Sequence, residues 1–196
     1  MKLKIFLLLM AVIIFMSGKT FAAIEVTDER ATPEYWINRA VDGDELMLNQ
    51  KQIERLNAEM LERDKYSADL ANYPETISAA DLRQRIEKIS KDVNLVGSGS
   101  VMANRNLSAL NYDVDIRYAV TTERVNIRLL PQGLTGDKYD SIQGTALDPA
   151  EPVAVLWESS DGKFSFVQAR YYFGWISKNS LAFTDRETWL TYVEPE

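Results

Sequence analysis

The side chains available for chemistry are carboxylates and aromatic rings, because the 196-residue sequence contains no cysteine and no histidine. This composition excludes a cysteine nucleophile, a serine–histidine pair, a thiolate metal site and an imidazole base. Two carboxylate pairs are spaced closely enough to be considered for acid–base catalysis, Asp148 with Glu151 and Asp137 with Asp140. Carboxylates in loops of an acidic protein are usually solvated, so we expect no catalytic residue, no metal site and no cofactor.

Aromatic side chains are better candidates for a binding site, because each offers a flat apolar face with a polar edge. We expect Trp157 and Trp175 in the core, since each lies in an apolar strand context. The predicted ligand-binding residues are Tyr118, Tyr139, Arg170, Tyr171 and Tyr172. Arg170 or Arg128 is placed to pair with the carboxylate of a peptide, and the alternative for each arginine is an ordinary surface charge.

Composition and charge limit the class of protein. With 46% hydrophobic and 10% aromatic residues, the chain can bury one or two cores. The formal net charge is −7, and the first 23 residues hold three lysines, so the remainder carries −10. The sequence shows no basic cluster. Nucleic acid is therefore a poor candidate partner, because its phosphates would repel the chain.

Residues 1–23 have the pattern of a secretory signal peptide. Lys2 and Lys4 precede the apolar run Ile5–Met16, and small residues at Ala22 and Ala23 offer a cleavage site. The run is short for a membrane span, and no cysteine follows that could carry a lipid. We expect a periplasmic or secreted protein. The alternative is an uncleaved anchor, which is the only membrane contact that the sequence predicts.

Residues 24–111 are predicted to be helical. One helix starts at Thr32-Pro33 and runs through Ala40, a second spans 49–63, and a third starts at Ser78 with Asp81 as its cap. The second and third helices carry apolar stripes at helical spacing: Ile53, Leu56, Met60 and Leu61, then Leu82, Ile86, Ile89 and Val93. We expect these stripes to face one another or the following domain, with a groove for a partner as the alternative. The glycine- and serine-rich segment 96–100 is typical of a linker.

Residues 112–196 are predicted to form a small β-barrel, so the fold class is α+β. The expected strands are 112–120, 125–128, 152–158, 163–169 and 174–176, and the expected last helix is 185–193. Asp161-Gly162 predicts a hairpin turn, and 132–144 is a long polar loop. Both faces of the strand 152–158 are apolar, so its outer face must pack against another element.

Four segments of this region resemble the bacterial SH3 domain of NlpC/P60 cell-wall peptidases: 117–121, 127–131, 174–176 and, most specifically, the TALDPAEPV string at 145–153. The residues Tyr35-Trp36 and the segment 48–53 are similar to the N-terminal stabilising domain of that family. The resemblance implies a helical domain packed on an SH3-like barrel. The family's catalytic domain uses a Cys–His pair, which has no counterpart in this sequence.

Three functions stay open on this basis. The first is a non-catalytic exported module that binds peptidoglycan stem peptides or docks on a separate cell-wall peptidase. The second is a truncated remnant of an NlpC/P60 gamma-D-glutamyl-diamino-acid endopeptidase, expected because the chain ends where the next domain would begin. The third is a hydrolase that uses the carboxylate pairs. The first is preferred, because the chain has no Cys–His pair and paired loop carboxylates are usually solvated.

Overall fold

The computed structural model describes residues 29–40, 43–91, 93, 99–134 and 140–194. The chain forms two compact units, residues 1–49 and 50–196, and each is considered by itself. The predicted α+β class is confirmed, because the larger unit combines helices with an antiparallel sheet. The predicted signal peptide at 1–23 lies outside the described residues. The predicted domain boundary between 111 and 112 stays a prediction.

The first unit contains a short helix, α2 (Pro33–Ile37), after a single turn η1 (Glu29–Ala31). Thr32 is the N-cap as predicted, and its hydroxyl accepts a hydrogen bond from the backbone N–H of Tyr35 at 3.3 Å. The helix was expected to continue through Ala40, which is wrong: it ends at Ile37, with Asn38 as the C-cap. A five-residue helix of this kind depends on its cap, because it has few internal hydrogen bonds.

The second unit is built on a seven-stranded antiparallel sheet in the order β5-β4-β8-β7-β6-β3-β9. Its strands are β3 (Arg117–Thr121), β4 (Val125–Arg128), β5 (Gln143–Leu147), β6 (Pro152–Glu158), β7 (Phe164–Gln168), β8 (Phe173–Ser177) and β9 (Leu181–Thr184). A separate two-stranded pair joins β1 (Thr76–Ile77) to β2 (Val114–Asp115). The strands predicted at 125–128, 152–158, 163–169 and 174–176 are found. The prediction of one strand over 112–120 is wrong, because β2 and β3 are separate strands in different sheets, and β1, β5 and β9 were not predicted. The β6–β7 hairpin turns at Gly162, where φ is 68°, as Asp161-Gly162 indicated.

The sheet is strongly curved and buries both of its faces. Its inner face holds small and branched side chains from five strands: Ala119, Val125, Ile127, Val153, Val155, Val167 and Ile176. Its outer face carries larger ones, including Leu156, Phe166, Phe173 and Trp175. The expectation that the outer face of β6 packs against another element is confirmed. One detail differs, because a β-bulge between Val155 and Trp157 turns Trp157 onto the outer face rather than the inner one.

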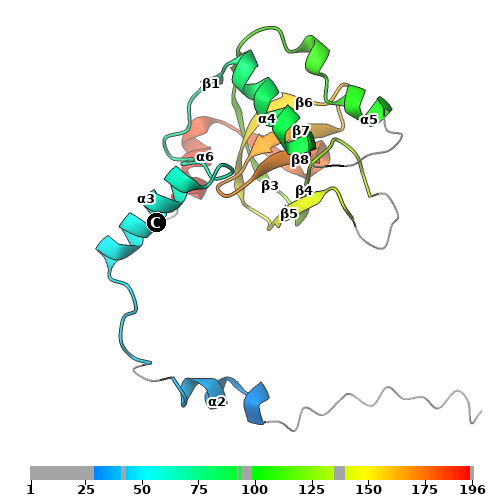
Figure 1. Ribbon diagram of the computed structural model, residues 1–196. Helices are drawn as coiled ribbons and strands as arrows, with labels where there is room; N and C mark the ends of the chain where they lie inside the picture. The colour runs from blue at the N-terminus through cyan, green and yellow to red at the C-terminus, as the bar shows by residue number, and fades with distance from the viewer. Residues whose placement is uncertain (1–28, 41–42, 92, 94–98, 135–139, 195–196) are drawn as a thin grey trace, which may run out of the picture. The chain divides into compact units, whose positions relative to one another are not determined.

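Helices cover the outer face. The helix α4 (Ala79–Lys91) crosses β6, β7 and β8 in Figure 1, and its buried Leu82, Ile86 and Ile89 join the outer core. Ser78 caps it as predicted: its hydroxyl accepts from the Asp81 backbone at 3.1 Å and donates to the Asp81 carboxylate at 2.7 Å. The helix α6 (Arg186–Val193) adds the fully buried Trp189. The helical and β segments of this unit therefore share one core.

The remaining helical segments contribute little to that core. The helix α3 (Gln50–Arg63) has no buried residue. Three short helical segments connect the larger elements: the α-helix α5 (Gly99–Asn104) and the 3-10 turns η2 (Leu107–Ala109) and η3 (Lys178–Ser180). Gly174 in β8 is required for close packing, because an added Cβ would lie 2.6 Å from Ile127 Cγ2 and 2.7 Å from the Arg128 carbonyl oxygen.

Candidate functional site

Two of the predicted ligand-binding residues, Arg170 and Tyr171, line one hollow of about 200 Å³, which we call the Tyr171 hollow. They come from the connection between β7 and β8. The last turns of α3 and the segment that follows it supply the rest of the lining: Asn57, Met60, Leu61, Ser67, Ala68 and Asp69. Tyr171 is 66% exposed, so its ring is available to a ligand. The hollow thus combines an open aromatic ring with apolar and polar side chains.

Backbone and side-chain hydrogen bonds fix the two walls against each other. The backbone N–H of Ala68 donates to the carbonyl of Arg170 at 2.9 Å. The side-chain amide of the buried Gln168 donates to the carbonyl of Tyr66 at 2.8 Å. The Arg170 guanidinium donates to the carbonyl of Val193, at the end of α6, at 2.6 Å. The hollow is therefore held by three separate parts of the chain, and little of it must be ordered when a ligand binds.

The apolar wall of the Tyr171 hollow comes from the stripe on α3. The stripe was expected to be buried, which is wrong: Ile53, Leu56, Met60 and Leu61 are between 40% and 47% exposed. The stripe of α4 also has helical spacing, and its Leu82, Ile86 and Ile89 are buried because α4 lies against the sheet. Val93 lies beyond the end of α4 and is half-buried. Half-exposed Met60 and Leu61 thus give the hollow an apolar side that still reaches solvent.

The hollow carries one charge of each sign. The side-chain amide of Asn72, two backbone N–H groups and the charge of Arg170 lower the pKa of the Asp69 carboxyl below its usual range. Asp69 is therefore ionised at neutral pH. Since Arg170 is also charged, a ligand meets a locally neutral site, and its binding cannot rest on long-range attraction.

The other predicted ligand-binding residues do not join this hollow. The ring of Tyr172 stacks on Tyr66 with centroids 5.0 Å apart and lies over Gly144, where a Cβ would be 2.6 Å from the ring. Tyr118 packs on the buried Trp189 at 4.8 Å and is half-buried. Tyr139 lies outside the described residues. The alternative role of Arg128 in carboxylate binding is not supported, because its side chain is buried and holds Asp140 with two hydrogen bonds of 2.6 and 2.9 Å.

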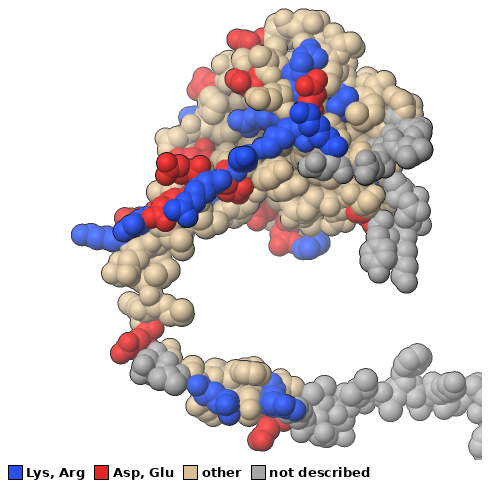
Figure 2. Space-filling model, in the orientation of Figure 1, with Lys and Arg blue, Asp and Glu red and all other residues tan. Residues whose placement is uncertain are grey.

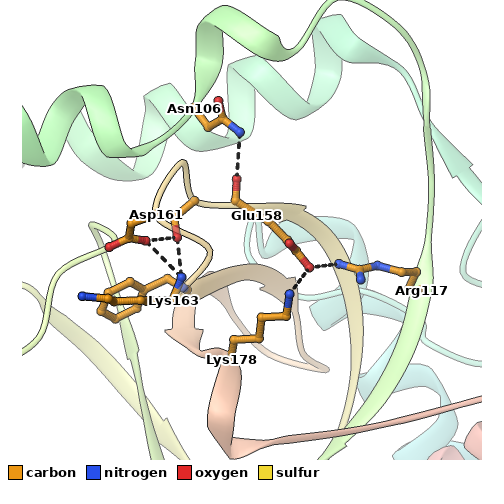
Figure 3. Close-up of polar contacts among 8 residues, drawn as sticks. Asn106, Arg117, Glu158, Asp161, Lys163 and Lys178 are labelled. Carbon is orange, nitrogen blue, oxygen red and sulfur yellow. Dashed lines mark hydrogen bonds and ion pairs between the residues drawn. The ribbon is translucent and has the colours of Figure 1, made fainter.

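Several described carboxylates form ion pairs, whereas the side chain of Glu151 forms no hydrogen bond or ion pair among the described residues. Asp148 pairs with Arg124 at the turn before β6, and Asp140 pairs with Arg128. Glu158 accepts hydrogen bonds from Arg117 at 2.6 Å and Lys178 at 2.9 Å (Figure 3). These bonds, from Lys178 first and Arg117 second, lower the pKa of Glu158. A general acid needs the opposite shift. Asp137 lies outside the described residues.

Basic and acidic residues are equally numerous over the segment that holds α3 and α4. Residues 50–91 contain eight basic and eight acidic residues, so the excess negative charge lies elsewhere in the chain. Figure 2 shows Lys and Arg side chains following one another over α3 and α4, with acidic side chains between and beside them. The basic side chains of this face are thus interleaved with acidic ones, and the expectation that the chain has no basic cluster stays a prediction.

No helix in the described ranges is both long and apolar enough to cross a bilayer. Within those same ranges, no group of three acidic side chains is close enough to hold a metal ion.

Comparison with known proteins identifies one domain. Residues 131–177 match the family model described as SH3 domain (SH3b1 type), so the resemblance to a bacterial SH3 domain is confirmed for that segment. No curated protein matches the sequence.

Among the solved structures similar to this chain is one titled "Insights into a novel NlpC/P60 Endopeptidase from Photobacterium damselae subsp. piscicida". It is 15% identical, with a TM-score of 0.46, and the match covers 72% of this chain. This chain spans 38% of that protein's length.

Most of the lining of the Tyr171 hollow was not predicted from the sequence. Arg170 and Tyr171 were found because a connection between strands favours exposed side chains. Met60 and Leu61 had been assigned to the core. Asn57 and Asp69 had no sequence signal, since only the bond between Ala68 and Arg170 brings their segment to this connection.

Proposed function

We propose that this chain is a non-catalytic, exported, cell-wall-associated module that binds peptides of peptidoglycan at the Tyr171 hollow. The observation that carries the proposal is the open ring of Tyr171 beside Arg170, within the segment that matches an SH3 domain of the SH3b1 type. A peptide would lay an aliphatic side chain against Met60 and Leu61 and a flat amide group on the tyrosine ring.

Binding at this site should be weak. The hollow is small, and its two opposite charges nearly cancel, so the contacts are short-range. A single shallow site of this kind gives dissociation constants in the ~mM to ~µM range. Because Asp69 and Arg170 offset each other, raising the salt concentration should change the affinity little.

The test is a pull-down with purified peptidoglycan sacculi at low and high salt. Tyr171→Ala should reduce retention several-fold and leave the fold intact, because the ring is mostly exposed. Tyr112→Ala is the matched control, since Tyr112 is also 66% exposed and lies outside the hollow. Strong retention that disappears with salt would contradict the proposal, and so would equal losses in the two variants.

A second function, docking on a separate cell-wall peptidase, is favoured by the exposed stripe of α3. Exposed apolar side chains in a row are typical of protein interfaces. This alternative predicts no retention by sacculi at either salt concentration and co-purification with a peptidase, which Leu56→Ala should weaken.

The same preparation tests the absence of catalysis. Incubated with peptidoglycan, the protein should release no soluble peptide above a blank. Release that one carboxylate substitution abolishes would restore the hydrolase hypothesis.

A further inference from the structure

A second hollow lies on the β-sheet side of the molecule and differs in chemistry from the Tyr171 hollow. It has a volume of about 370 Å³, and we call it the Lys163 hollow. Its lining residues come from β4, the segment after β4, the start of β7 and the end of β8: Val125, Asn126, Arg128, Gly133, Leu134, Lys163, Phe164, Ser177 and Asn179. Its size is at the lower end of the range for small-molecule sites, about 300 to 1,000 Å³.

Four polar side chains of this hollow are uncommitted. Among the described residues, the side chains of Asn126, Lys163, Ser177 and Asn179 form no hydrogen bond or ion pair. Figure 3 shows the Lys163 side chain extending away from Glu158, Arg117 and Lys178, which form the neighbouring cluster. Two amides, a hydroxyl and an ammonium group therefore border one space and are not held by other described side chains, so they are available to a ligand.

The rest of the lining is apolar or electrically balanced. Phe164 is half-buried, so part of its ring faces the surface, and Leu134 is 78% exposed. The buried Arg128 is neutralised by Asp140, which accepts two hydrogen bonds from it. Among the described lining residues, Lys163 thus supplies the net charge, and that charge is positive in a protein whose formal charge is −7.

We infer that the Lys163 hollow binds a saccharide that carries one carboxylate. The amides and the hydroxyl of Ser177 are donors and acceptors suited to sugar hydroxyls, and a flat ring such as Phe164 suits the apolar face of a pyranose. Lys163 is the partner for the carboxylate.

The number of polar groups around the hollow suits a sugar. A sugar ring carries a hydroxyl on most of its carbons, and each hydroxyl can both donate and accept, so one ring can meet several of these amide and hydroxyl groups at once. The two asparagines stand on separate elements, β4 and η3, so a ligand that satisfies both must present polar groups in two directions.

The experiment uses three sugars with the same ring and different charge: glucuronate, glucose and glucosamine. Each is titrated into the ¹⁵N-labelled full chain. NMR follows the side-chain amide signals of Asn126 and Asn179, together with the backbone amide signals of the lining residues Leu134, Phe164 and Ser177, which remain in every asparagine variant. We expect both groups of signals to shift with glucuronate and glucose. Glucuronate should bind about fivefold more tightly than glucose, as expected for one exposed ion pair, and glucosamine should bind most weakly.

Substitutions separate the roles of the polar groups. Lys163→Gln should remove the preference for glucuronate over glucose and retain binding of glucose. Asn126→Ala combined with Asn179→Ala should abolish binding of all three sugars. Asn111→Ala, an uncharged change at an exposed asparagine outside both hollows, is the matched control and should change nothing.

Several results would overturn the inference. These are the absence of amide shifts with every sugar, equal affinity for the three sugars, or a preference for glucuronate that survives Lys163→Gln. Far-UV circular dichroism of each variant shows whether a loss of binding comes from unfolding. If the alanine double variant does not fold, the double variant Asn126→Ser with Asn179→Ser tests the same loss of sugar binding. None of these outcomes depends on retention by sacculi, so this site is tested independently of the proposed function.

Discussion

Replacing Ile86 by alanine tests whether α4 and the sheet form one cooperative unit. Ile86 is fully buried between α4 and the outer face of the sheet. The change removes three carbon atoms, worth roughly 2.5 kcal/mol of transfer free energy, and the residual cavity raises the expected loss to about 3 to 4 kcal/mol. We expect the free energy of unfolding to fall by that amount in a single transition.

The assay is equilibrium unfolding in urea, followed by both tryptophan fluorescence and far-UV circular dichroism. The buried Trp175 and Trp189 report on the sheet and on α6, and circular dichroism reports on the helices. Leu56→Ala on α3 is the control, and it should cost less than about 1 kcal/mol because Leu56 is 46% exposed. Two transitions at different urea concentrations, or a loss below about 1 kcal/mol for Ile86→Ala, would refute the shared core.

Three further changes test other parts of the fold. Gly174→Ala should destabilise the sheet by about 2 to 4 kcal/mol in the same urea assay, because the added Cβ meets a backbone carbonyl, whereas Gly133→Ala, with nothing within 4 Å, should be nearly neutral. Asp140→Ala should cost about 3 to 5 kcal/mol, since it leaves the buried Arg128 guanidinium without its ion-pair partner, and a loss below about 1 kcal/mol would contradict that role. Glu158→Gln should lower stability at neutral pH. Folding lowers the pKa of Glu158, so the stability that its charged carboxylate contributes is present above the usual glutamate pKa of about 4.3 and is lost as the pH falls through the folded pKa. The difference in free energy of unfolding between variant and parent should therefore shrink below about pH 4. A constant difference from pH 7 to pH 3 would argue against this role of Glu158.

Local features of the fold could be predicted from the sequence where the signal lies within a few residues. Ser78 and Asp81 cap α4, Asp161-Gly162 turns the β6–β7 hairpin, and alternation along β6 showed that both faces need cover. In each case the determining interaction joins neighbours in the chain, so spacing and residue type are enough. Composition likewise removed cysteine and histidine chemistry without any structure.

The candidate sites depended on contacts between distant segments. The stripes of α3 and α4 both have helical spacing, yet only α4 meets the sheet, since burial depends on a facing surface rather than on spacing. Tyr171 and Tyr172 are adjacent, but Tyr172 alone finds Tyr66 to stack on. A one-residue bulge turned Trp157 to the opposite face.

The Lys163 hollow shows the same limit. Three of its polar residues lie far apart in the sequence, Asn126, Lys163 and Asn179. Each is an ordinary polar residue within its own segment, so no local pattern marks it as part of a site. The curvature of the sheet brings the end of β8 beside β4 and the start of β7. The sequence by itself determined most helices and strands, and it excluded the chemistry of cysteine and histidine. Tertiary packing decided which polar groups lie together, because that depends on long-range strand pairing and not on local propensity.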